Sequence, residues 1–320
     1  MNVRHTFFWV GVTPEAGPMG TVPNGQMYVE RVSPPEAASG QPIVLIHGGG
    51  GQGLDWLGTP DGRPGWAQLL ASRGHDVYVV DRPGHGRSPY HPDLLGPMFP
   101  PATYEMLAEI FTPDPEGDLG RGHTEWPGGR LPGDQTMDQF MAGAGPMRAE
   151  LAAAHALEQR CLAELLDQIG PAVVFSHSAG GPAGFLAAEA RPDAVTRLVA
   201  IEPIGPPFLK RPEIGLSLDW GLAAAPFEFD PPVDDAGELD PDQPRHLVNL
   251  SRVPITLVTA PSSMVGLADP ATAAFLRAAG CDVDHIRLDE HGFPGNGHGM
   301  MMERNSSEVL ELLLARLAPA

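Results

Sequence analysis

The sequence predicts an α/β protein whose central sheet is mostly parallel and is flanked by helices. Strand-like and helix-like segments alternate along the chain, a pattern typical of parallel sheets covered by helices. The segment Val173–Gly181 runs from an apolar strand through a serine-containing turn into a helix. Two glycine-rich segments, HGGGG at 47–51 and GNGHG at 295–299, each follow a strand-like run. Together these observations indicate a catalytic site at the ends of parallel strands.

Each predicted strand is a short apolar run bounded by Gly, Pro or polar residues. The strands are Thr6–Val12, Gln26–Val32, Pro42–Ile46, Asp76–Val80, Pro171–Phe175, Val195–Ile201, Pro254–Thr259 and Asp282–Leu288. The predicted helices are Trp66–Ser72, Pro146–Ile169, Ala179–Ala190, Pro270–Ala279 and Ser307–Leu317. The strongest helical pattern is that of Pro146–Ile169, where Leu157, Cys161 and Leu165 recur at helical spacing.

Two segments rich in proline and glycine interrupt this alternation, at about 89–145 and 203–250. Structureless loops of such length are uncommon inside a compact domain unless they are functional. We therefore expect a single domain over residues 1–320, with these two insertions forming a lid or cap. A chain of 320 residues is consistent with one α/β domain.

The composition excludes several classes of partner. The formal net charge is −20, whereas nucleic acids and anionic lipids require a basic surface. Two cysteines, Cys161 and Cys281, are too few for a zinc site or a disulfide framework, so we expect buried apolar roles for both and no metal. No apolar stretch is long enough for a membrane span. The N-terminus lacks a clear signal peptide, which favours a cytoplasmic location with export left open.

Ser178 is the candidate nucleophile. It lies in SHSAGG, between the apolar strand and the following helix, which is the context of a nucleophile elbow. The helix N-terminus there favours developing negative charge. The usual pattern is G-x-S-x-G, and Ser176 replaces its first glycine. Ser176 itself fits worse as a nucleophile, because Ser178 rather than a glycine stands two residues later.

A serine hydroxyl needs a neighbouring base, and His298 is the leading candidate among the 12 histidines. It lies in GNGHG, after the last strand and before the last helix. His291, in the same loop, is the alternative. The acid that orients the base is either Glu202, directly after strand Val195–Ile201, or Asp269, beyond the next strand; we favour Glu202.

The glycines of HGGGG allow backbone N–H groups to point into the site. We expect one oxyanion donor at Gly49 and the second at the N–H of Ala179, the residue after the nucleophile. A phosphate-binding role is weaker, because the lysine of a P-loop and the GxGxxG spacing are both missing.

With HGGGG, DRPGHGRS, SHSAGG and GNGHG in place, the chain resembles the α/β-hydrolase superfamily along nearly its full length. More narrowly, it is similar to bacterial esterases of the esterase 713-like family, which carry the acid as a glutamate after the sixth strand, as IEP does here. The resemblance supports Glu202 and Gly49 in their roles. It also implies carboxylic-ester hydrolysis, no cofactor and a homodimer. The type member has adjacent cysteines where this chain has Gly49–Gly50.

The leading hypothesis is a serine esterase with a Ser178–His298–Glu202 triad and an acyl-enzyme intermediate, acting on a small-molecule ester. A lactonase, amidase, thioesterase or C–C bond hydrolase uses the same triad, so these remain alternatives. A catalytically silent binding protein is a third hypothesis, disfavoured because all three triad residues are present. Eight large side chains are candidate lining residues of the pocket: Phe99, Phe111, Trp126, Phe140, Met147, Phe208, Trp220 and Phe227.

Overall fold

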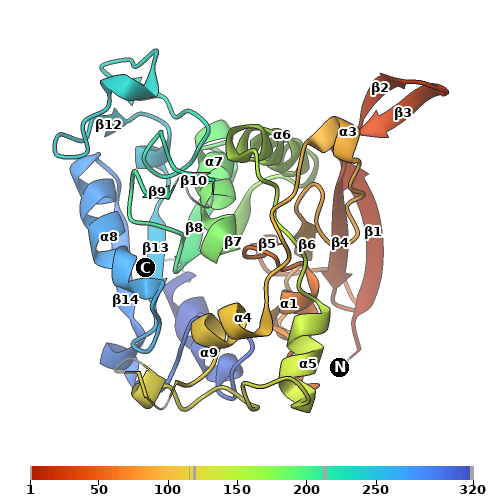
Figure 1. Cartoon of the computed structure of the whole chain (residues 1–320), viewed down its shortest axis with the longest axis vertical. Helices are drawn as coiled ribbons and strands as arrows, with labels where there is room; N and C mark the ends of the chain where they lie inside the picture. Colours follow the sequence, from red (N-terminus) through yellow and green to blue (C-terminus); the bar gives the residue numbers. More distant parts are fainter. Residues whose placement is uncertain (1, 115, 118–119, 212–214, 318–320) are drawn as a thin grey trace.

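An eight-stranded sheet crosses the whole molecule in the order β1-β4-β6-β5-β7-β8-β13-β14 (Figure 1). The computed structural model describes residues 2–114, 116–117, 120–211 and 215–317. The strands are β1 (Arg4–Val10), β4 (Met27–Ser33), β6 (Val77–Asp81), β5 (Ile43–Ile46), β7 (Ala172–His177), β8 (Val195–Ile201), β13 (Ile255–Thr259) and β14 (Val283–Arg287). Strands β1 and β4 pair antiparallel, and the pairs from β6 to β14 are parallel. The predicted, mostly parallel sheet is confirmed.

The predicted helices are present within a few residues of their expected bounds. They are α2 (Trp66–Ser72), α6 (Leu151–Ile169), α7 (Gly181–Ala190), α8 (Asp269–Ala278) and α9 (Ser306–Leu317). The one large difference is the start of α6, which begins five residues later than Pro146 because a loop across the site takes up 146–150. A short helix, α1 (Leu54–Leu57), was not predicted.

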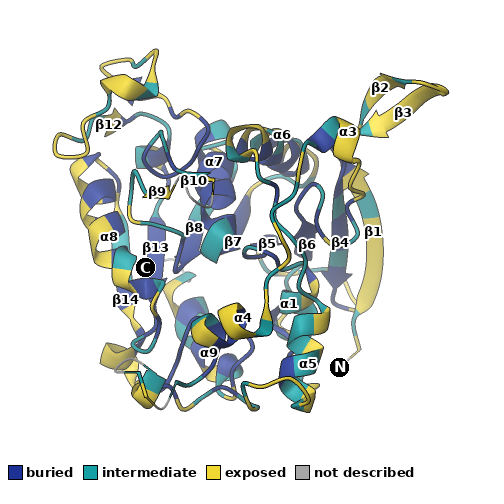
Figure 2. Ribbon diagram, viewed as in Figure 1, coloured by how far each residue is buried: buried dark blue, intermediate teal, exposed yellow. Residues whose placement is uncertain are grey.

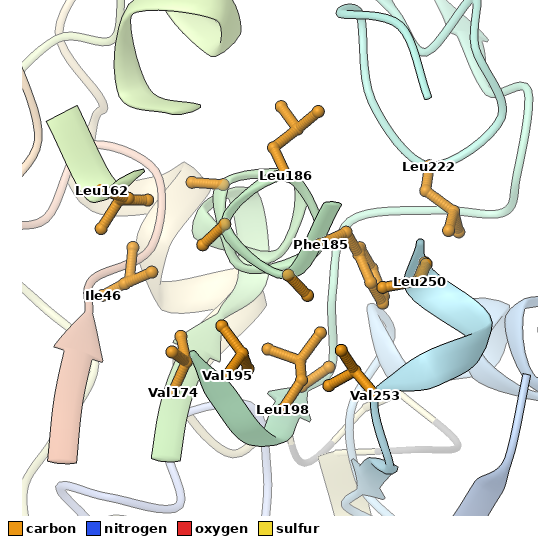
Figure 3. Close-up of a cluster of buried hydrophobic side chains, with 14 of the residues drawn as sticks. Ile46, Leu162, Val174, Phe185, Leu186, Val195, Leu198, Leu222, Leu250 and Val253 are labelled. Atoms are coloured by element: carbon orange, nitrogen blue, oxygen red, sulfur yellow. The ribbon is translucent and has the colours of Figure 1, made fainter. Parts of the chain in front are cut away.

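Apolar residues cover both faces of the sheet, because the parallel strands are buried on each side. One core packs α6 and α7 against the sheet; Figure 3 shows Phe185 and Leu186 of α7 above Val174 and Leu198 of the strands. The other core packs α2 and α9 against the opposite face, with the buried Trp66 at its centre. The sheet is thus fixed from both sides, and its strand ends form a rigid platform.

The first insertion lies between β6 and α6 and holds α3 (Pro92–Leu95), α4 (Tyr104–Phe111) and α5 (Gln135–Ala142). The sequence showed little periodicity there, yet Thr103 and Asp134 cap α4 and α5 through side-chain hydrogen bonds. The second insertion holds four two-residue strands: β9 (Lys210–Arg211), β10 (Leu216–Ser217), β11 (Phe229–Asp230) and β12 (His246–Leu247).

A hairpin near the N-terminus was also missed. Its strands, β2 (Thr13–Gly17) and β3 (Gly20–Asn24), project from the sheet edge and are largely exposed (Figure 2). They lack the buried face that gives a strand its alternating pattern. Both cysteines are buried, as predicted, and the structure shows that both are free. Within the described ranges, no helix combines the length and apolar character needed to cross a membrane.

Candidate active site

Ser178 directly follows β7 and begins a short 3₁₀ turn, Ser178–Gly180, that leads into α7. Its φ is +53°, in the left-handed region that a residue with a side chain adopts only when the surrounding structure holds it there. The following glycine, Gly180, is required by sterics, since a Cβ there would lie 2.2 Å from the carbonyl oxygen of His47. The serine therefore occupies a sharp, constrained strand-to-helix turn.

Ser176, which replaces the first glycine of the usual motif, is accommodated from the opposite side. It is fully buried in β7. A Cβ on Gly184 of α7 would lie 2.4 Å from the Ser176 hydroxyl oxygen. Gly184 on the helix therefore leaves room for the Ser176 side chain on the strand, and β7 and α7 can still approach each other closely.

The sheet register places Ser178 and Glu202 at the same level. His177 of β7 pairs with Ile201 of β8, so Ser178 and Glu202 are the next residues on neighbouring parallel strands. Glu202 also has a positive φ, +41°, which turns the chain at the strand end. Two unrelated segments therefore deliver a hydroxyl and a carboxylate to the same edge of the sheet.

His298 joins this edge from the loop after β14. Its Nδ1 lies 2.6 Å from Glu202 Oε2, and both side chains are almost fully buried. Glu202 also accepts hydrogen bonds from Ala260 N at 2.7 Å and from Ser263 Oγ at 2.7 Å. Three donors on two oxygens suit a carboxylate. His298 Nε2 is buried without a hydrogen-bond partner in the described part of the chain.

The two alternative residues lie elsewhere. Asp269 is buried at the start of α8, where it accepts a hydrogen bond from Thr259 Oγ1 at 2.6 Å. His291 is exposed at the end of the turn Leu288–His291. The carboxylate that accepts from His298 Nδ1 is that of Glu202 and not that of Asp269. The structure thus joins His298 to Glu202, and it places Ser178 and Glu202 directly after neighbouring strands of the sheet.

Burial sets the charge states around this trio. Burial lowers the pKa of His298 to about 3, so its imidazole is neutral near neutral pH, as a general base requires. Burial raises the pKa of Glu202, and the hydrogen bonds donated by Ser263 and Ala260 oppose that rise. Burial also raises the pKa of Asp269, to about 8, with the neighbouring Glu202 charge adding to the effect.

The glycine loop after β5 is held by a buried arginine. The carbonyl oxygen of Gly48 accepts a hydrogen bond from Arg82 Nη2 at 2.9 Å, and His47 Nδ1 lies 2.8 Å from it. In a trans peptide the following N–H points the opposite way, so the N–H of Gly49 faces away from Arg82. A Cβ on Gly49 would lie 3.0 Å from Ala179 Cβ. The predicted oxyanion donors, Gly49 and Ala179, are therefore neighbours.

Two histidines to which the sequence assigned no catalytic role hold the loop that carries His298. His177 Nε2 lies 3.0 Å from the carbonyl oxygen of His298, with the two rings 4.5 Å apart. His123, in the first insertion, lies 2.7 Å from Glu303 Oε1, and Glu303 also accepts from Asn296 Nδ2 and Gly297 N. The loop that carries His298 is thus tied both to the elbow and to the insertion.

Only part of the predicted aromatic lining reaches this trio. Phe111 packs against His298 with ring centroids 5.0 Å apart, and Phe140 makes edge-to-face contacts with both Phe111 and Trp126. Met147 lies against Gly49. Three others pack at a distance in the α7 core: Phe208, Trp220 and Phe227. Phe99 instead lies against Gly215 of the second insertion.

Among the described residues no cluster of three or more His, Cys, Asp or Glu side chains is arranged for a metal ion.

The mostly parallel sheet covered by helices on both faces is the fold of the α/β hydrolases. Residues 41–233 match the model of the family described as alpha/beta hydrolase fold, and the chain belongs to this family. A curated relative, the probable secreted lipase phiG of Fungal sp. (strain ATCC 74256), is 35% identical over 97% of this chain and 88% of phiG.

A solved structure described as a novel bacterial esterase is also similar. It has a TM-score of 0.70 and 26% sequence identity, and the match covers 98% of this chain and 95% of that chain. The resemblance to bacterial esterases predicted from sequence is therefore confirmed.

Proposed function

We infer that this protein is a carboxylic ester hydrolase of the lipase and esterase type. The full-length similarity to a protein named as a lipase and to a structure named as an esterase supports the reaction class. The site supports it independently, because it offers a constrained serine, a neutral histidine and a buried carboxylate at one edge of the sheet. The substrate we propose is a small-molecule ester.

We further propose Ser178 as nucleophile, His298 as base and Glu202 as the residue that orients the base. The observation that carries this assignment is the state of His298: Glu202 holds Nδ1, while Nε2 has no partner within the described chain. A carboxylate on Nδ1 fixes the tautomer in which Nε2 accepts a proton. Nε2 is therefore left for the Ser178 hydroxyl.

The proposed reaction proceeds through an acyl-enzyme. Ser178 Oγ attacks the ester carbonyl carbon while His298 Nε2 takes the hydroxyl proton, and the oxyanion accepts hydrogen bonds from the N–H groups of Gly49 and Ala179. Collapse breaks the bond to the alcohol, which receives the proton from His298. Water then attacks the acyl-Ser178 ester with His298 again as base, releasing the acid.

Labelling with a fluorophosphonate probe tests the assignment, because such probes react only with an activated serine. We expect the wild-type chain to be labelled and to lose esterase activity in parallel. The Ser178→Ala variant should show neither property, whereas Ser176→Ala should keep both. Labelling that persists in Ser178→Ala would refute the nucleophile.

Three further expectations from sequence remain proposals. The insertions 89–145 and 203–250 would act as a lid over the site, and the chain would form a homodimer. Light scattering of the purified protein at several concentrations tests the dimer. We also retain a cytoplasmic location as a proposal, tested by fractionation of the source cells; phiG is named as secreted.

A further inference from the structure

A second feature of the site is a partly enclosed cavity beside the nucleophile elbow. Its walls include Ala179, the residue after Ser178, and Met147, which lies against Gly49. Its empty volume is about 400 Å³, which includes the part that is open to solvent. A small group that enters this cavity would lie next to the proposed reaction centre.

Most of the surface that lines this cavity is apolar, but five buried ionisable side chains also contribute to its wall. They are Arg82, His85, Arg148, His155 and Glu158, each no more than 5% exposed. Arg148 Nε donates a hydrogen bond to the backbone carbonyl oxygen of Leu95 at 3.0 Å. Its Nη1 is buried and has no partner among the residues that the structure describes. Buried arginine donors are rarely left unsatisfied without a ligand to receive them.

The charges on this wall do not cancel. Arg82 donates from Nη1 to Glu158 Oε1 at 3.0 Å, which forms one neutral buried pair. Burial lowers the pKa of both His85 and His155, so both are neutral. Arg148 is left as the excess positive charge. Glu150, the other acid near Arg148, is exposed, and water screens it.

This local charge is opposite to that of the whole chain. The sequence holds 20 Lys and Arg against 40 Asp and Glu, yet two of those arginines are buried in one cavity next to Ala179. An uncompensated buried charge is costly unless it is paired. A planar guanidinium is the side chain best matched to a carboxylate, which it binds through two parallel hydrogen bonds.

We propose that this cavity is a subsite for a carboxylate of the substrate, with Arg148 as the residue that recognises it. The inference rests on the proposed ester hydrolysis and names its substrate class. The preferred substrates are esters that carry a free carboxylate a few bonds from the scissile carbonyl, in the acyl or in the alcohol part. A half-ester of a short dicarboxylic acid is the simplest example. Arg148 thus acts as a specificity determinant, and Ser178 and His298 keep their roles.

Two matched pairs of esters test the proposal. In the acyl pair, para-nitrophenyl hydrogen glutarate is compared with para-nitrophenyl glutaramate, in which a carboxamide replaces the carboxylate at equal size. In the alcohol pair, 4-acetoxybutanoate is compared with 4-acetoxybutanamide. Ser178→Ala supplies the background rate for each. We expect the wild type to favour the anionic member of at least one pair by about tenfold or more in kcat/KM.

Arg148→Met keeps an unbranched side chain as far as the position of Nε and removes the guanidinium group with its charge. We expect it to lower kcat/KM for the anionic ester by about 10- to 100-fold and to leave the carboxamide within about threefold. Arg130→Met is the matched control, because Arg130 is a partly exposed arginine of the first insertion that pairs with Asp114. It should keep the preference. Equal losses on both members of the pair would show that Arg148 only supports the fold, and would overturn the proposal.

The outcome remains decisive if Arg148→Met does not fold, because the wild-type preference between matched esters is itself the test. A wild type with no preference in either pair refutes the subsite. Calorimetric titration of Ser178→Ala with monoethyl glutarate and with ethyl glutaramate separates this result from failure of the proposed function. If Ser178→Ala bound the anionic ester more tightly than the carboxamide while the wild type hydrolysed neither ester, the subsite would be supported and the hydrolase mechanism refuted.

Discussion

Replacing Glu202 by glutamine removes the charge that orients His298 and changes almost nothing else in volume. The carboxylate accepts three hydrogen bonds, from Ala260 N, Ser263 Oγ and His298 Nδ1. An amide has a single acceptor oxygen. If that oxygen stays with Ala260, the NH₂ group faces His298 and donates to Nδ1. His298 then carries its proton on Nε2, the atom that must accept the proton of Ser178.

The magnitude follows from this change of tautomer. The equivalent carboxylate-to-amide change in a serine-protease triad lowers kcat about 10⁴-fold. We expect about 10³- to 10⁴-fold for Glu202→Gln, which corresponds to roughly 4 to 5.5 kcal/mol in activation free energy. KM should change little, because the geometry of the pocket is retained. Stopped-assay hydrolysis of a para-nitrophenyl ester measures kcat, and ¹⁵N NMR of the histidine ring reports the tautomer directly.

Asp269→Asn is the matched control. Asp269 accepts a hydrogen bond from Thr259 Oγ1, whereas His298 is held by Glu202, so asparagine at 269 removes a nearby buried carboxyl group and leaves the partner of His298 in place. The amide oxygen can still accept from Thr259 Oγ1, and we expect less than about threefold change in kcat. If Asp269→Asn lost more activity than Glu202→Gln, the acid would be Asp269 and the reasoning from the 2.6 Å contact would be wrong.

Three further predictions follow from single contacts. Gly184→Ala should lower the free energy of unfolding by about 1–3 kcal/mol through overpacking, and adding Ser176→Gly should restore most of it in urea titrations. His123→Asn should lower kcat about tenfold without changing KM, because it loosens the loop that carries His298, whereas the exposed His291→Asn should not; steady-state kinetics decide. Burial lowers the pKa of His155 to about 3, below its unfolded value near 6.5, so the unfolded chain binds more protons between these values. This histidine's contribution is therefore complete above pH 6.5 and falls by up to about 1.4 kcal/mol per pH unit as the solution is acidified; urea titrations of His155→Asn should show a correspondingly weaker pH dependence.

The site could be predicted from sequence where its residues follow strands. Ser178 and Glu202 both come directly after buried apolar runs, and parallel strands bring their carboxyl ends to one edge. His298 could be predicted because it lies in a glycine-rich loop that follows the last strand. Local sequence patterns therefore identified the candidate residues. The pairing of His177 with Ile201 then shows that Ser178 and Glu202 follow neighbouring strands at the same level.

The parts that were missed depend on contacts between distant segments. His123 and Glu303 are 180 positions apart in the sequence, and neither lies in a recognisable motif. Helices α4 and α5 are each eight residues long, too short for a clear period among the surrounding prolines. The signal that was available was the capping pattern of Thr103 and Asp134, each a side chain of the preferred type just before an apolar segment.

Arg82 links the two halves of the proposed site. Its Nη2 holds the carbonyl oxygen of Gly48 and so directs the N–H of Gly49 toward the oxyanion, while its Nη1 pairs with Glu158 in the cavity wall. Loss of Arg82 should therefore slow every ester, since every ester uses the oxyanion donors, and it should also weaken the preference for anionic esters, because Glu158 would then offset the charge of Arg148. Arg148 touches the cavity without holding the glycine loop. Substitutions at Arg148 should therefore change which esters are preferred without slowing all of them, whereas substitutions at Arg82 should do both.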